Sequence, residues 1–176
     1  MKPLQIRLTT LTVLVALVAF TRLLPHPPNF APVSALALFG AALFERKWLG
    51  LLAPLAAMLL SDLVLGFHGL MPHVYGSFLL SWLIGLLLLR KPNVLNVSLA
   101  ALLSSVLFFA ITNFGVWYGG PFYPQTREGL LACYAAAIPF FQYTLLGDLF
   151  FSALLFGGYA LLQQRFPVLQ VSRISR

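Results

Sequence analysis

Long apolar stretches alternate with short polar links along this chain. The apolar stretches are Leu8–Leu24, Pro32–Phe44, Trp48–Gly66, Val74–Leu89, Val94–Tyr118 and Phe140–Leu162. A hydrocarbon layer about 30 Å thick is crossed by about 20 helical residues. The pattern therefore predicts an all-α, polytopic membrane protein, with six transmembrane helices in one domain over residues 1–176. The second stretch, rich in small residues, is short for a full crossing.

Composition and charge give this bundle an orientation. Of the 176 residues, 60% are hydrophobic and only 9% are charged, which excludes an ordinary soluble domain. Nine of the eleven basic residues fall on one side of a six-helix topology, in four clusters: Lys2/Arg7, Arg46/Lys47, Arg90/Lys91 and Arg165/Arg173/Arg176. The positive-inside rule then predicts that both termini lie in the cytoplasm. The net charge of +7 is explained by this topology and indicates no nucleic-acid partner.

The links on the predicted outer side are longer and richer in proline than the inner ones. They cover Pro25–Ala31, Phe67–His73 and Gly119–Gly129. After the third outer link, Leu130–Ala137 is apolar but too short to cross a membrane, and Pro139 follows it. We expect this segment to form a separate short interfacial helix before the last span.

Two of the four acidic residues, Asp62 and Asp148, lie inside predicted helices. A carboxylate at such depth costs several kcal/mol unless it is paired, protonated or open to water, so each is a functional candidate. The alternative for each is a structural pair with Arg22, and the sequence leaves both interpretations open. Thr144, Asp148 and Ser152 recur at helical spacing, which predicts a polar stripe that faces the bundle interior.

Other polar and aromatic side chains gather on the outer half of the predicted bundle. Together with the two aspartates they form the candidate binding set: His26, Asn29, Asp62, His68, Asn113, Trp117, Tyr123 and Asp148. These residues predict an outward-facing cup for a small molecule, although for Trp117 alone an anchor in the aromatic belt is the favoured interpretation. Familiar catalytic motifs are lacking, so we expect no enzyme activity. The single Cys133 excludes an internal disulfide framework and a multi-thiolate metal site, and the sequence leaves any cofactor unknown.

Four sequence blocks carry a resemblance to known proteins: PHPPNFAPVSALALFGAALF, LLSDLVLGFH, FFAITNFGVWYGG and IPFFQYTLLGDLFF. With these blocks the chain resembles an uncharacterised family of small bacterial integral membrane proteins, which implies a location in the bacterial inner membrane. In size and helix layout it is also similar to the S components of energy-coupling factor (ECF) transporters. That second resemblance implies capture of a vitamin-like molecule from outside and an ATP-driven coupling module as partner. The alanine pair in the first helix, Ala16 and Ala19, departs from the alanine-x-x-x-alanine docking motif of many S components.

The leading hypothesis is a capture or transport subunit for a small, vitamin-like molecule. One alternative is a membrane redox or metallocofactor protein, with histidines of the outer links as ligands. The other is a structural or assembly factor, in which the small-residue pairs Ala37/Ala41 and Ala53/Ala57 pack against a partner.

Overall fold

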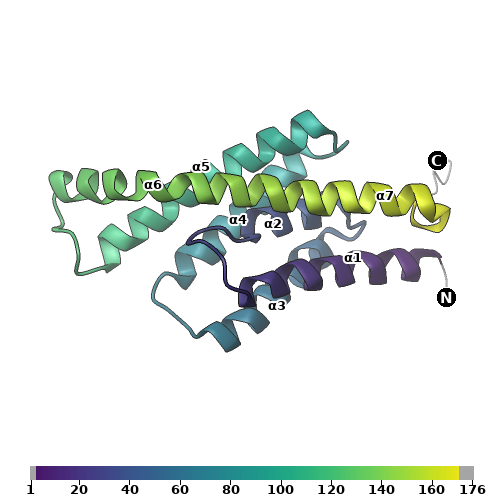
Figure 1. The fold of residues 1–176 in the computed structure, drawn as a ribbon, viewed down its shortest axis with the longest axis horizontal. Helices are drawn as coiled ribbons and strands as arrows, with labels where there is room; N and C mark the ends of the chain where they lie inside the picture. Colours follow the sequence, from purple (N-terminus) through teal and green to yellow (C-terminus); the bar gives the residue numbers. More distant parts are fainter. Residues whose placement is uncertain (1–2, 171–176) are drawn as a thin grey trace.

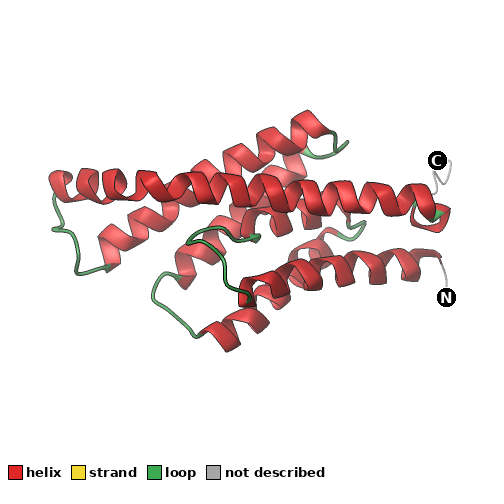
Figure 2. Cartoon of the chain, in the orientation of Figure 1, coloured by secondary structure: helices red, strands yellow, loops and turns green. Residues whose placement is uncertain are grey.

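A computed structural model describes residues 3–170, which fold as helices joined by short links (Figure 2). The elements are α1 (Pro3–Phe20) with a 3-10 turn (Thr21–Leu23), α2 (Val33–Leu43), α3 (Lys47–Leu65), α4 (Met71–Leu88), α5 (Val94–Gly119), α6 (Arg127–Ser152), a π-helical segment (Ala153–Gly157), α7 (Gly158–Arg165) and a 3-10 turn (Pro167–Leu169). The described part of the chain contains no strand. The predicted all-α class is confirmed.

Five helices are long and apolar enough to cross a membrane: α1 with its following turn, α3, α4, α5 and the continuous α6–α7. The fold is that of a polytopic helical membrane protein. The predicted second span is also helical, but α2 has only 11 residues. At 1.5 Å per residue it is about 16 Å long, roughly half the hydrocarbon thickness, and does not cross a membrane by itself.

The short helix α2 occupies the centre of the bundle and packs against α1, α3, α4, α5 and α6. Every residue from Val33 to Ala41 is buried. A helix that is apolar on all sides is stable only when other helices surround it. Glycines allow the closest approaches, because a Cβ on Gly40 would overlap the backbone of Gly50, and one on Gly85 would overlap Ala41. The small residues of this region therefore serve packing within the bundle.

The predicted interfacial helix is not separate, which corrects that part of the sequence analysis. Residues Arg127–Arg165 form one continuous helical rod of 39 residues that runs through Pro139 (Figure 1). Its first half packs along α5, where Tyr134 donates a hydrogen bond to the Ala110 carbonyl at 2.6 Å and its ring contacts Phe109. Pro139 removes only one backbone hydrogen bond from the helix. The contacts with α5 are therefore enough to keep the segment helical.

The bundle has two chemically different ends. At one end the Arg7 guanidinium contacts Glu45, the Leu43 carbonyl and the Tyr159 hydroxyl, which brings together the start of α1, the α2–α3 link and α7. We call this the basic end, because its exposed residues include Arg46, Arg90, Lys91 and Arg165. The opposite, loop end carries the links 24–32, 66–70 and 120–126 (Figure 1). The remaining residues of the basic clusters, Lys2, Arg173 and Arg176, lie outside the described residues.

Candidate functional site at the loop end

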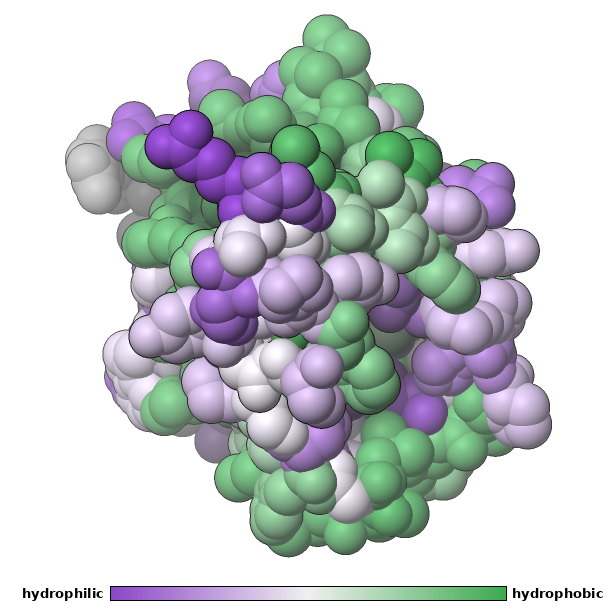
Figure 3. Space-filling model, turned by 90° about the vertical axis from the view of Figure 1, so that its left-hand side faces the viewer, coloured by the Kyte–Doolittle hydropathy of each residue, from purple (hydrophilic) through white to green (hydrophobic). Residues whose placement is uncertain are grey.

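A polar pocket of about 210 Å³ lies at the loop end. It is lined by residues of the 3-10 turn after α1, of the links 24–32 and 66–70, and of helices α2 to α6: Arg22, His26, Asn29, Ala31, Val33, Ser34, Leu65, His68, Val74, Phe108, Thr144 and Asp148. Figure 3 views the molecule from this end and shows hydrophilic residues gathered between apolar ones. The pocket joins segments far apart in the sequence, as expected of a binding site.

The link 24–32 forms one wall of the pocket and is held in a fixed shape. Asn29 has a φ of 64°, a left-handed conformation that asparagine tolerates better than most residues. The Phe30 N–H donates to the Pro27 carbonyl at 3.0 Å, and the Phe30 ring contacts Phe150 and Phe151. Gly147 allows this wall to approach α6, since an added Cβ would lie 3.2 Å from the Ala31 nitrogen. The link is thereby anchored on α6 beside Asp148.

The floor of the pocket is a buried carboxylate at the start of α2. Asp148 is 1% exposed, and its Oδ2 accepts a hydrogen bond from the Ser105 hydroxyl at 2.7 Å. It also accepts hydrogen bonds from the Ser34 hydroxyl and from the backbone N–H groups of Ser34 and Ala35. The N-cap position of α2 is Pro32, which gives no side-chain cap. Asp148 therefore caps α2 from another helix, where a negative charge also complements the helix dipole.

The second buried aspartate belongs to an ion pair beside the pocket. The Arg22 guanidinium donates to Asp62 Oδ1 at 2.6 Å, to the Met58 carbonyl and to the Ser61 hydroxyl. The Tyr75 hydroxyl donates to Asp62 Oδ2 at 2.7 Å. Of the two pairings with Arg22 that the sequence leaves open, the structure shows the one with Asp62. Asp62, on α3, thereby connects the end of α1 with α4. Asp62 does not line the pocket itself, but its partner Arg22 does.

The pocket brings together four residues of the candidate set, His26, Asn29, His68 and Asp148. The other residues of the set do not line it. Asn113 donates to the Phe109 carbonyl at 2.8 Å, one helical turn away. Trp117 donates to the Pro124 carbonyl at 3.0 Å and contacts neighbouring aromatic rings, as a residue of an aromatic belt would. Tyr123 is half-buried in the link 120–126, away from the residues that line the pocket.

Sequence reasoning missed several residues of the pocket. Ser34 lies two residues after Pro32, so a helix-start signal is present, but nothing in the sequence pairs it with α6. The sequence indicates Arg22 only as a partner for an aspartate. Thr144 was recognised through the stripe that it shares with Asp148, and both residues do line the pocket. Ser152, the third member of the stripe, lies beyond it and faces a different cavity.

The pocket offers no ready metal centre. Among the described residues, no three His, Cys, Asp or Glu side chains are close enough together to hold a metal ion. His26 Nδ1 lies 2.9 Å from the Pro27 carbonyl, within its own link. What the pocket can do chemically is bind hydrogen-bonding groups beside a buried carboxyl group.

Comparison with protein families supports a relationship over nearly the whole chain. A family of unknown function (DUF6580) matches residues 2–169. The chain belongs to this family. The match agrees with the family-level resemblance of the four sequence blocks, whereas the similarity to ECF S components is not confirmed. Neither the curated proteins nor the solved structures contain a match. Membership of DUF6580 assigns no activity, so the functional argument depends on the geometry.

Proposed function

We propose that this protein captures a small polar solute in the loop-end pocket, as the binding part of a transport system. One observation carries the proposal: a non-helical link and the start of a half-length helix meet inside the bundle at a buried carboxylate. Irregular backbone at membrane depth is stable only where protein buries it or where it lines a water-filled cavity. Interrupted helices whose ends meet a polar cavity are typical of solute sites in transporters.

The charges around the pocket favour a neutral or cationic solute. Asp62 pairs with Arg22, so Asp148 is the one acidic group among the described lining residues that has no basic partner. A solute with an amine or several hydroxyl groups would complement this carboxyl group. The volume of about 210 Å³ lies below the roughly 300–1,000 Å³ of sites for drug-sized ligands, so the solute is smaller than most vitamins.

We infer the orientation in the membrane from the residues of the basic end. Arg46, Lys47, Arg90, Lys91 and Arg165 belong to the clusters that the positive-inside rule assigns to the cytoplasm. With this end inside, the pocket opens on the outer face of a bacterial inner membrane, where a capture subunit would meet its solute.

The alternatives receive less support from the described residues. A metallocofactor protein needs a cluster of ligands, and none is found among them. A purely structural role would account for Asp148 as the cap of α2. It would not account for a pocket that reaches this carboxylate from the loop end.

The proposal is tested by the thermal stability of detergent-purified protein with short-chain primary and hydroxylated amines, compared with carboxylic acids of the same length. We expect one or more amines to raise the melting temperature and the acids to have no such effect. Stabilisation by the acids alone, or by none of the compounds, would contradict the proposal.

A matched pair of variants locates the binding. Thr144→Val removes one hydroxyl from the pocket without changing the side-chain shape and should weaken stabilisation by the amine. Thr112→Val makes the same change on α5, where the hydroxyl donates only to the Phe108 carbonyl, and should bind normally. An equal loss in both variants would place the solute elsewhere.

A further inference from the structure

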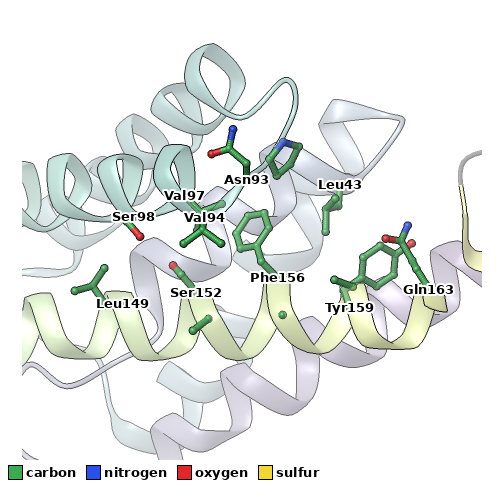
Figure 4. Close-up of a pocket in the computed structure, with 14 residues that line it drawn as sticks. Leu43, Asn93, Val94, Val97, Ser98, Leu149, Ser152, Phe156, Tyr159 and Gln163 are labelled. Carbon is green, nitrogen blue, oxygen red and sulfur yellow. The ribbon is translucent and has the colours of Figure 1, made fainter. Parts of the chain in front are cut away.

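A second, larger cavity lies between α5 and the helical rod, toward the basic end. The two elements pack together where the Ser105 hydroxyl meets Asp148, and α5 diverges from the rod before α7 (Figures 1 and 4). The resulting wedge has a volume of about 460 Å³. It is separate from the loop-end pocket, and the two share no lining residue.

The wedge is shaped by apolar and small side chains. Val94 and Val97 of α5 face Leu149 and Phe156 of the rod, and these four residues are labelled in Figure 4. Ala153 and Gly157 of the π-helical segment and Ala160 of α7 lie on the rod, and the small size of these residues leaves this wall open. Insertions of this type in helices are frequent at functional sites.

The length of the wedge matches one half of a bilayer. It extends from Leu149 and Ser152 at its deep end to Gln163 near the end of α7. Between Ser152 and Gln163 the helix rises about 16 Å, close to half of a hydrocarbon layer about 30 Å thick. An extended chain that entered at the basic end would therefore reach the middle of the membrane.

The mouth of the wedge is basic. Pro92 and Asn93 line it, and the exposed Arg90 and Lys91 directly precede them in the α4–α5 link. Arg165, also exposed, follows Gln163 by two residues. Basic side chains at a membrane surface attract anionic lipid headgroups. An apolar wedge with a cationic mouth thus complements a molecule with an apolar chain and an anionic head.

We propose that the wedge binds one acyl chain of an anionic phospholipid from the leaflet at the basic end. Arg90 and Lys91 contact the phosphate of this lipid, and the chain lies between α5 and the rod. The bound lipid fills the space where these two elements diverge.

Native mass spectrometry tests this assignment on protein purified in a mild detergent. The protein is incubated with equal amounts of palmitoyl-oleoyl phosphatidylglycerol and phosphatidylcholine. We expect one retained phosphatidylglycerol, favoured over phosphatidylcholine by about tenfold or more because two basic residues lie at the mouth. No retained lipid, equal retention of both lipids, or a lipid-free dimer with the wedge covered by a second copy would overturn the proposal.

Neighbouring glycines provide the matched controls. An added Cβ meets nothing within 4 Å at either Gly157 or Gly158, but only Gly157 lines the wedge. Gly157→Leu should abolish lipid retention, and Gly158→Leu should preserve it. Val94→Trp blocks the opposite wall at a side chain that is 86% exposed, so it leaves the core intact and should also abolish retention. Retention in both blocking variants at the wild-type level would overturn the proposal.

The headgroup is tested separately from the chain. The double variant Arg90→Gln/Lys91→Gln should still retain a lipid but lose the preference for phosphatidylglycerol. Arg127→Gln removes a basic residue from the loop end and should keep the preference. A preference unchanged in the double variant would contradict the role of these two residues.

Discussion

Asp62 and Asp148 show how the same side chain is stabilised in two ways within one bundle. Asp62 is neutralised by a guanidinium and a phenol, whereas Asp148 is surrounded by hydroxyl and backbone N–H donors. The sequence indicated that both were buried, and the stripe through Thr144 indicated that Asp148 faces the interior. It could not assign Arg22 to one of them, because that choice depends on how the end of α1 packs on α3.

Removal of the charge of Asp62 should destabilise the protein strongly. The side chains of Arg22 and Asp62 are 11% and 4% exposed, so Asp62→Asn leaves a buried cation without its partner. We expect a loss of about 3–5 kcal/mol, measured by reversible unfolding in mixed micelles. The double variant Arg22→Gln/Asp62→Asn should recover much of that loss. Additive losses would show that the two residues do not act as a pair.

Asp148 should contribute to stability through the start of α2. Asp148→Ala leaves the N–H groups of Ser34 and Ala35 without their acceptor, at a cost of about 1–3 kcal/mol. Ser105→Ala removes a single donor and should cost less, about 1 kcal/mol. Hydrogen exchange should then increase in the first turn of α2 in the Asp148 variant. Unchanged exchange there would contradict the capping role.

At the scale of helices, the apolar runs predicted most boundaries within a few residues. Their failure at α6 has a physical cause. A short apolar run followed by Pro139 is typical of a helix end, yet contacts such as Tyr134 with α5 keep the backbone helical. Such contacts join residues distant in the sequence, and no local pattern reports them.

The crossing of α2 and α3 at Gly40 and Gly50 should tolerate no larger residue. Gly40→Ala would drive a methyl group into the Gly50 backbone and should destabilise the bundle by about 1–3 kcal/mol. Gly76→Ala on α4 is the control, because an added Cβ there meets nothing within 4 Å. That control should be neutral or stabilising by about 0.5–1 kcal/mol, because alanine is the better helix former. Equal destabilisation in the two variants would contradict the close crossing.

For the whole molecule, the sequence indicated that the outer links lie together at one end of the bundle. It did not indicate which helix ends contribute to the same pocket as these links. His26, Asn29 and His68 meet in one pocket because their links lie at the same end of the bundle. Asn113 and Trp117 lie on the part of α5 that contacts the first half of α6 and the link 120–126. The three-dimensional course of α5 therefore separates them from the pocket.

The proposed orientation is tested with single cysteines in intact cells. Cysteine at Gln125 should react with an impermeant thiol reagent, and cysteine at Lys91 should react only after the membrane is opened, because the positive-inside rule places Lys91 in the cytoplasm. The native Cys133 is buried and provides a low background. Labelling of Lys91→Cys from outside would reverse the topology.

The shortness of α2 also has an electrical consequence. Where water enters the loop-end pocket, the insulating layer thins toward the length of α2, about 16 Å instead of about 30 Å. The membrane voltage then falls mainly across this short distance, and the local field is nearly doubled. In the proposed orientation, a cation that descends to Asp148 would gain part of the roughly 2.3 kcal/mol that each charge gains per 100 mV. In a polarised cell, voltage would thus increase the occupancy of the site by cations without any change in its contacts.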